Sequence, residues 1–160
     1  MKAYAIVLGG GSGTRMGADI NKVFLPLRGI PAIIRAIAPF TAICSGIVVV
    51  ARESELVMMR AAVAQYGLGK AVLAVVAGGA DRQASVAHGL AALPPDADTV
   101  LIHDGARALV TEDVLQRALE SVCEHGSGVA SVAITDTIKR ADTDGRALET
   151  LDRSSLRAMQ

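Results

Sequence analysis

The chain has 160 residues, half of them apolar, and its aromatic residues are two tyrosines and two phenylalanines. This length and composition fit one globular domain with an aliphatic core and exclude a disordered chain. Sixteen basic and sixteen acidic residues cancel, which argues against a chain that binds nucleic acid or an anionic membrane through its overall charge.

The absence of targeting signals and the spacing of the cysteines exclude further classes of protein. The apolar run before Gly9 is too short for a signal peptide, and no segment reaches the ~20 apolar residues of a membrane span. The expected location is therefore the cytoplasm, with no membrane partner. Cys44 and Cys123 lie far apart and outside any C-x-x-C or Cys/His spacing. We expect two free, buried thiols rather than a zinc site or a disulfide framework.

Short apolar runs alternate along the chain with segments of helical period. Strands of a buried parallel sheet are predicted at 4–9, 46–52, 71–79, 99–105 and 128–134. Helices are predicted at 31–40, 54–67, 81–94 and 111–126, with N-caps at Ser54, Asp81 and Thr111 and C-terminal stops at Gly67 and Gly126. This order predicts an α/β fold with a doubly wound, mostly parallel, Rossmann-like sheet.

The composition changes near Asp136. From there the chain is polar, and the turn sequence "TDG" separates two short strand-like pieces. We therefore predict a nucleotide-binding α/β core over 1–135 and an extended β-arm over 136–160.

Ligands of doubly wound sheets collect beyond the carboxyl ends of the strands. Three segments rich in glycine and charge follow predicted strands, and we expect them to converge. These segments are Gly9 to Arg15, Gly78 to Ser85, and His103 to Arg107.

The first segment, "LGGGSGTRMG", matches neither G-x-G-x-x-G nor G-x-x-x-x-G-K-[ST]. This argues against a nicotinamide or flavin enzyme and against a phosphate-loop kinase or ATPase. Its glycines can bring backbone amides close to an anion, and Arg15 and Lys22 can reach back over bound phosphates. The alternative is a tight strand-to-helix turn with solvated cations.

The other two segments offer a carboxylate and a hydroxyl. Asp104 should project from a strand end, where it could bind Mg²⁺, although a turn carboxylate is the alternative. His103 should point to the opposite face in a structural role. Arg82 and Ser85 lie on the first turn of a predicted helix, where they suit either the edge of a base or ordinary capping.

Six motifs together resemble one enzyme family over essentially the whole chain. "LGGGSGTRMG", "NKVFLPL", "GGADRQASV", "HDGAR", "TDTIKR" and "TLDRSSLRAMQ" occur in the order and spacing of the 2-C-methyl-D-erythritol 4-phosphate cytidylyltransferases. The resemblance implies a Rossmann-like nucleotidyltransferase that transfers CMP from CTP to a sugar-alcohol phosphate and releases pyrophosphate. It further implies a need for Mg²⁺, a role in non-mevalonate isoprenoid synthesis, and a homodimer formed through 136–160.

Position by position, the resemblance assigns roles to individual residues. Catalytic roles fall to Arg15, Lys22 and Asp104, with Asp104 also near the metal. Nucleotide contacts fall to Gly9, Gly10, Gly11, Ser12, Gly13, Gly79, Ala80, Arg82 and Ser85. Substrate contacts fall to Arg107, Thr137, Lys139 and Arg153, of which the last three would reach the neighbouring subunit's site.

The implied chemistry needs no general base, because a phosphomonoester nucleophile is already ionised near neutral pH. The family continues past the point where this chain stops, so we expect a C-terminal segment to be missing. Three alternatives stay open: a D-ribitol-5-phosphate cytidylyltransferase, a catalytically incomplete nucleotide-binding module, and a structural α/β domain whose glycines only make turns.

Overall fold

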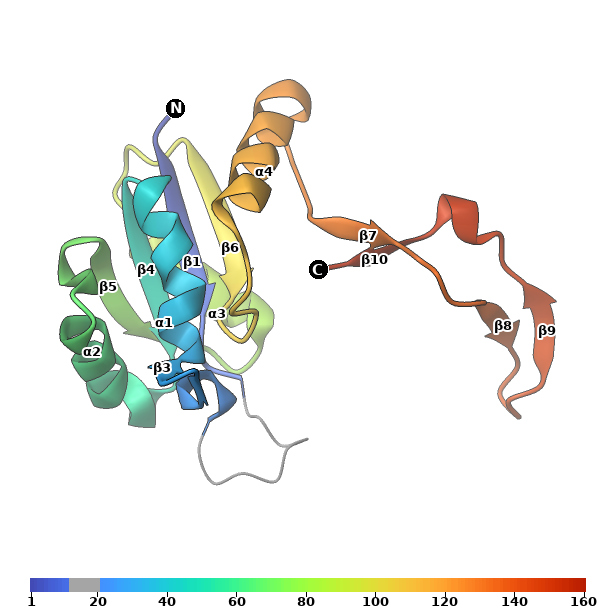
Figure 1. The fold of residues 1–160 in the computed structure, drawn as a ribbon, viewed down its shortest axis with the longest axis horizontal. Coiled ribbons are helices and arrows are strands. Elements are labelled where there is room, and N and C mark those ends of the chain that lie inside the picture. The colour runs from blue at the N-terminus through green and yellow to red at the C-terminus, as the bar shows by residue number, and fades with distance from the viewer. Residues whose placement is uncertain (12–20) are drawn as a thin grey trace. The chain divides into compact units, whose positions relative to one another are not determined.

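The computed structural model describes residues 1–11 and 21–160, which divide into two units, Met1–Leu115 and Gln116–Gln160. The described part of the first unit contains a parallel sheet with strand order β5-β4-β1-β6 (Figure 1). Its strands are β1 (Ala3–Leu8), β4 (Gly46–Ala51), β5 (Val72–Ala77) and β6 (Thr99–Asp104). Every residue of β4 is buried, as expected for a central strand that is covered on both faces.

Helices lie on both faces of this sheet. Ile33 and Ile37 of α1 (Ala32–Ile37) and Met59 of α2 (Leu56–Gln65) share one buried cluster with the side chains of Ala5 and Val7 on β1. The opposite face receives α3 (Arg82–Ala91), whose Gly89 packs so closely that an added Cβ would lie 2.7 Å from Ile6 Cγ2. The doubly wound α/β fold predicted from the sequence is therefore confirmed.

Some predicted helix boundaries agree with the structure and others differ, among them the end of the helix predicted over 81–94, which stops at Ala91. Asp81 is the N-cap of α3, where its carboxylate accepts from the amide of Ala84 at 2.7 Å. Ser54 was wrong as an N-cap, because it lies inside a 3₁₀ turn, Glu53–Glu55, and α2 starts at Leu56. The helix expected over 31–40 stops at Ile37 and continues as a 3₁₀ helix, Ala38–Ala42, since proline at the start of that turn cannot donate to the α-helical ladder.

The remaining elements of the first unit are short. A two-stranded hairpin pairs β2 (Pro26–Leu27) with β3 (Ile30–Pro31), and 3₁₀ turns cover Lys22–Phe24 and Leu68–Lys70. Gly67 follows Tyr66, the C-cap of α2, and adopts φ +72°, the left-handed conformation expected of a C-terminal stop.

The second unit contains two antiparallel ribbons. α4 (Glu112–His125) starts in the first unit and runs into this one, where it ends before Gly126 at φ +76°. One ribbon pairs β7 (Ser131–Ala133) with β10 (Arg157–Met159), and the other pairs β8 (Lys139–Ala141) with β9 (Ala147–Thr150). A 3₁₀ turn covers Arg153–Ser155.

One strand prediction was wrong in its pairing. The run 128–134 was expected to join the parallel sheet, but its strand β7 pairs antiparallel with β10, and all three β7 residues are exposed. Apolar composition alone cannot select a partner strand. The turn at "TDG" is confirmed, with Gly145 at φ +82° between β8 and β9. The division of roles between a core over 1–135 and an arm over 136–160 stays a prediction.

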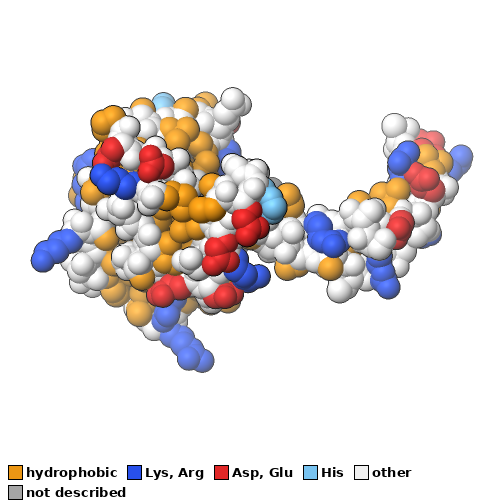
Figure 2. Space-filling view, turned by 90° about the horizontal axis from the view of Figure 1, so that it is seen from above, with side chains coloured by type: hydrophobic (Ala, Val, Ile, Leu, Met, Phe, Trp, Pro, Cys, Tyr) orange, Lys and Arg blue, Asp and Glu red, His pale blue; other side chains and the backbone are white. Residues whose placement is uncertain are grey.

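Within the described ranges, no helix has both the length and the apolar character that spanning a membrane would require. Figure 2 shows basic and acidic side chains interspersed on the face in view, in agreement with the balanced composition.

Candidate functional site

The three predicted segments leave the sheet from one edge. Beyond the strand ends, the amide of Gly9 donates to the carbonyl of Val50 at 2.7 Å, and that of Gly78 to the carbonyl of Ala51 at 2.8 Å. The amide of Gly105 likewise donates to the carbonyl of Leu8 at 2.8 Å. Each segment thus adds one backbone hydrogen bond to the sheet before the chain turns away from it. The convergence predicted from the sequence is present in the described residues.

The described part of the glycine loop is held by its carbonyls. The carbonyl of Gly9 accepts from Asn21 Nδ2 at 2.8 Å, and the carbonyls of Gly10 and Gly11 accept from Arg52. The Gly9 amide donates within the sheet, and the predicted nucleotide contacts of Gly9, Gly10 and Gly11 stay predictions. The amides of Gly10 and Gly11 have no hydrogen-bond partner among the described residues. The predicted contacts of Ser12, Gly13 and Arg15 lie outside the described residues.

Lys22 is brought to the same edge by its neighbour in the sequence. Asn21 is only 4% exposed and caps the 3₁₀ turn that starts at Lys22, accepting from the amide of Val23 at 3.3 Å. Because the Asn21 amide also donates to Gly9, the backbone at Lys22 is fixed beside the end of β1. The Lys22 side chain is exposed, as a cation that meets a soluble anionic ligand must be.

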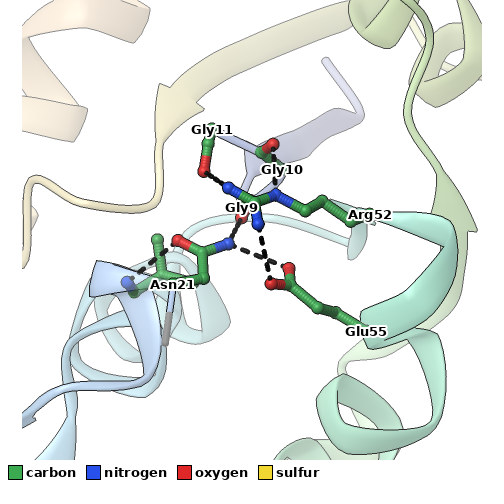
Figure 3. A network of polar contacts seen from close by, with 7 residues as sticks. Gly9, Gly10, Gly11, Asn21, Arg52 and Glu55 are labelled. Atoms are coloured by element: carbon green, nitrogen blue, oxygen red, sulfur yellow. Dashed lines mark hydrogen bonds and ion pairs between the residues drawn. The ribbon is translucent and has the colours of Figure 1, made fainter. Parts of the chain in front are cut away.

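Sequence reasoning missed Arg52 and Glu55, which complete this corner of the site. Arg52 follows β4 directly, and Glu55 lies one 3₁₀ turn later. They form an ion pair with Nη1 to Oε1 at 3.5 Å, and Glu55 Oε2 accepts from Asn21 Nδ2 at 2.9 Å (Figure 3). The rule that flagged the other strand ends applies equally to β4 and could have found Arg52.

The carboxylate of Asp104 lies between two guanidinium groups. Arg82 Nη2, on the first turn of α3, is 3.2 Å from Asp104 Oδ1, and Arg107 Nε is 3.7 Å from Oδ2. The Asp104 side chain is 43% exposed, so water screens these pairs and they hold the carboxylate only weakly. An incoming cation or anion can therefore rearrange the three charges.

Asp104 can bind Mg²⁺ only together with the phosphates of a bound substrate. In the described part of the chain, no group of three or more histidine, cysteine or acidic side chains is placed to hold a metal. Mg²⁺ keeps several waters and commonly binds through one carboxylate plus substrate phosphates. The single exposed carboxylate of Asp104 fits that mode of binding.

His103 has the structural role expected of it. Its Nε2 lies 3.0 Å from the carbonyl of Arg107, and its ring packs 5.2 Å from that of Phe40 between centroids. Burial lowers the pKa of His103, because the charged imidazolium would lose its hydration.

The segment after β5 is braced by Ser85. The Ser85 hydroxyl donates to the carbonyl of Asp81 at 2.8 Å and accepts from the amide of Gly79 at 3.1 Å. A Cβ added to Gly79 would lie 2.3 Å from the Cβ of Ala84, which explains the glycine. Ser85 therefore shapes this loop, and the predicted base contacts of Gly79, Ala80 and Ser85 stay predictions.

The three predicted substrate residues of the arm lie in the second unit. Thr137 is exposed between β7 and β8. Lys139 Nζ donates to Thr150 Oγ1 at 2.9 Å, and Arg153 Nη1 donates to the carbonyl of Thr135 at 2.7 Å. Their proposed reach into another subunit's site stays a prediction.

Comparisons with known proteins agree with this architecture. The family model described as "IspD: 2-C-methyl-D-erythritol 4-phosphate cytidylyltransferase" matches residues 3–160. The chain is 41% identical to the 2-C-methyl-D-erythritol 4-phosphate cytidylyltransferase of Shouchella clausii, covering 100% of this chain and 69% of that protein. It is also 41% identical to the bifunctional IspD/IspF enzyme of Clavibacter michiganensis, covering 97% of this chain and 39% of that protein.

A solved structure shares the fold. The 4-diphosphocytidyl-2C-methyl-D-erythritol synthase of Anaerococcus prevotii superposes with a TM-score of 0.85 at 21% identity, covering 99% of this chain and 68% of that one. The family match extends over nearly the whole chain and through every strand end described above. The chain therefore belongs to the IspD family of 2-C-methyl-D-erythritol 4-phosphate cytidylyltransferases.

Proposed function

We propose that this chain binds CTP at the carboxyl edge of its sheet and transfers CMP to 2-C-methyl-D-erythritol 4-phosphate, with release of pyrophosphate. The observation that supports the proposal is the position of Gly9, Gly78 and Gly105, each of which adds one hydrogen bond beyond a strand end at the carboxyl edge of the sheet in a chain of this family. If the glycines only formed turns, there would be no reason for three charged residues to lie at this same edge of the sheet. These residues are Lys22, Arg82 and Asp104.

The reaction brings anions together, so cations and backbone donors are suitable catalysts. The attacking phosphate oxygen is ionised near neutral pH and needs no general base. Lys22 and Arg15 would neutralise charge that develops on the attacked α-phosphoryl group, and the amides of Gly10 and Gly11 would donate to phosphate oxygens. Positioning and electrostatic stabilisation supply the rate, with no covalent intermediate on the protein.

The charges around Asp104 would be redistributed when CTP binds. When bound, Mg²⁺ would draw electrons from the phosphate oxygens and favour attack at phosphorus. We assign Asp104 as its protein ligand. Arg82 and Arg107 would then be released to phosphate groups of the nucleotide and the acceptor, since their present pairs with Asp104 are exposed and weak.

The arm and the cellular location belong to the same proposal. The arm's ribbons expose Val132, Leu148 and Met159, and isolated two-stranded ribbons are only marginally stable in water. We propose that 136–160 forms a homodimer contact and offers Thr137, Lys139 and Arg153 to the partner's acceptor site, and that the enzyme works in the cytoplasm. Sedimentation that gives a monomer at the concentration used for catalysis would contradict the dimer.

Binding and turnover test the function separately. Titration calorimetry with Mg²⁺ should give binding of CTP and much weaker binding of ATP. Pyrophosphate release should occur with CTP and 2-C-methyl-D-erythritol 4-phosphate and be far slower with D-ribitol 5-phosphate. Equal binding of CTP and ATP refutes a cytidine-specific site. Faster pyrophosphate release with D-ribitol 5-phosphate would identify that compound as the acceptor instead.

A further inference from the structure

Three consecutive carbonyls of the glycine loop are held by side chains that no family role described above includes. Arg52 uses all three of its side-chain nitrogens: Nε donates to the carbonyl of Gly10 at 3.3 Å, Nη2 to that of Gly11 at 2.6 Å, and Nη1 pairs with Glu55 (Figure 3). A planar guanidinium can direct donors to several acceptors at once, which an ammonium group cannot do with the same geometry.

Asn21 completes the arrangement on the other side of Glu55. Its Nδ2 lies 2.8 Å from the carbonyl of Gly9 and 2.9 Å from Glu55 Oε2. The Glu55 side chain is only 12% exposed. Its carboxylate contacts both Arg52 and Asn21, the two side chains that donate to the loop. We call Asn21, Arg52 and Glu55 the carbonyl clamp.

The clamp dictates where the loop's amides point. The described peptide bonds are all trans, so each carbonyl points opposite to the N–H of the same peptide unit. With the carbonyls of Gly9 and Gly10 turned toward the clamp, the amides of Gly10 and Gly11 are turned away from it. These are the two amides that lack a partner among the described residues.

We propose that the carbonyl clamp is a positioning device that aims the amides of Gly10 and Gly11 at the triphosphate of the nucleotide. This inference rests on the proposed function and adds positioning residues to its site. Donors on a carbonyl also polarise the whole peptide unit, which makes the opposite N–H a stronger hydrogen-bond donor. Arg52 is neutralised by Glu55, so it acts through geometry rather than by attracting the anion with its charge.

Two substitutions separate geometry from charge. Arg52→Gln removes both the positive charge and the planar guanidinium with its several donors. Arg52→Lys keeps the charge and removes only the planar set of donors. A matched control is Arg60→Gln, because Arg60 on the neighbouring helix α2 also donates to a backbone carbonyl, that of Val75 at 3.1 Å, away from the glycine loop.

We expect both Arg52 variants to raise the Kd for CTP, measured by calorimetry with Mg²⁺, about tenfold, which corresponds to about 1.4 kcal/mol. The KM for CTP in pyrophosphate release should rise with it, while the KM for the acceptor should stay unchanged. Arg60→Gln should leave all three values unchanged. Binding by Arg52→Lys that equals the unsubstituted chain, or an equal loss with Arg60→Gln, overturns the proposal.

A second measurement separates this inference from the proposed function. In ¹H–¹⁵N spectra of the ligand-free chain, Arg52→Lys should move the amide signals of Gly10 and Gly11 and leave Gly69 in place. Failure of the unsubstituted chain to bind CTP refutes the proposed function and, with it, the clamp's nucleotide role. Unmoved signals of Gly10 and Gly11 overturn the clamp itself, even if the chain binds CTP.

Discussion

Asn21→Asp tests how strongly the buried amide holds this corner of the molecule. The substitution keeps the shape of the side chain but replaces the Nδ2 donor with a carboxylate oxygen. The two acceptors that Nδ2 now serves, the carbonyl of Gly9 at 2.8 Å and Glu55 Oε2 at 2.9 Å, would then face a negative charge. The bond from the amide of Val23 to Oδ1 would remain.

The magnitude follows from the contacts that are lost. A neutral hydrogen bond contributes about 1 kcal/mol and one to a charged group about 1.5–3 kcal/mol, so these two losses sum to about 2.5–4 kcal/mol. Repulsion between the introduced carboxylate and Glu55 adds to this and raises the pKa of the introduced carboxyl, because two adjacent carboxylates do not both ionise readily. We expect the free energy of unfolding to fall by about 3–5 kcal/mol at pH 8.

The pH dependence has a definite sign. A carboxyl whose pKa is raised by folding is stabilising while protonated, and that stability is lost as the pH rises through the raised pKa. The deficit of Asn21→Asp relative to the unsubstituted chain should therefore shrink from pH 8 to pH 5 in urea unfolding followed by circular dichroism. Gln83→Glu, the same chemical change at an exposed site on α3, should alter stability by less than about 0.5 kcal/mol. A deficit below about 1 kcal/mol at pH 8, or one that does not change with pH, would refute the reasoning.

Three further predictions address other residues. Lys22→Ala should lower turnover about 100-fold with an unchanged circular dichroism spectrum, as for loss of one well-placed charge donor, and a loss below about tenfold would reject its catalytic role. Gly79→Ala should destabilise by about 1–3 kcal/mol in thermal or urea unfolding, because the new Cβ would lie 2.3 Å from that of Ala84. The control Gly69→Ala, with nothing within 4 Å of its Cβ, should change stability little, and equal losses in the two variants would contradict the packing argument. Burial raises the pKa of the Cys44 thiol to about 11, so its alkylation, followed by peptide mapping, should stay slow near neutral pH and accelerate only as the pH approaches that value; rapid labelling near pH 8.5 would be inconsistent.

The sequence by itself determined the parallel sheet, its two helical layers and the edge from which the three glycine-containing segments leave. Continuous apolar runs such as 46–51 are stable only where both faces of a strand are covered, and glycines directly after strands allow the tight backbone turns found there. Asp81 and Gly67 were likewise readable, because N-capping and left-handed backbone depend on the residue and its immediate neighbours.

Only the tertiary structure decided the contacts between residues far apart in the sequence. The pairing of β7 with β10 and the bonds of Arg52 to Gly10 and Gly11 join segments that no local pattern links. The sequence presented the glycine loop as a row of amide donors. In the fold, the Gly9 amide donates within the sheet, and side chains distant in the sequence donate to the loop's carbonyls. Buried polar groups need hydrogen-bond partners, and the tertiary structure determines which groups are near enough to supply them.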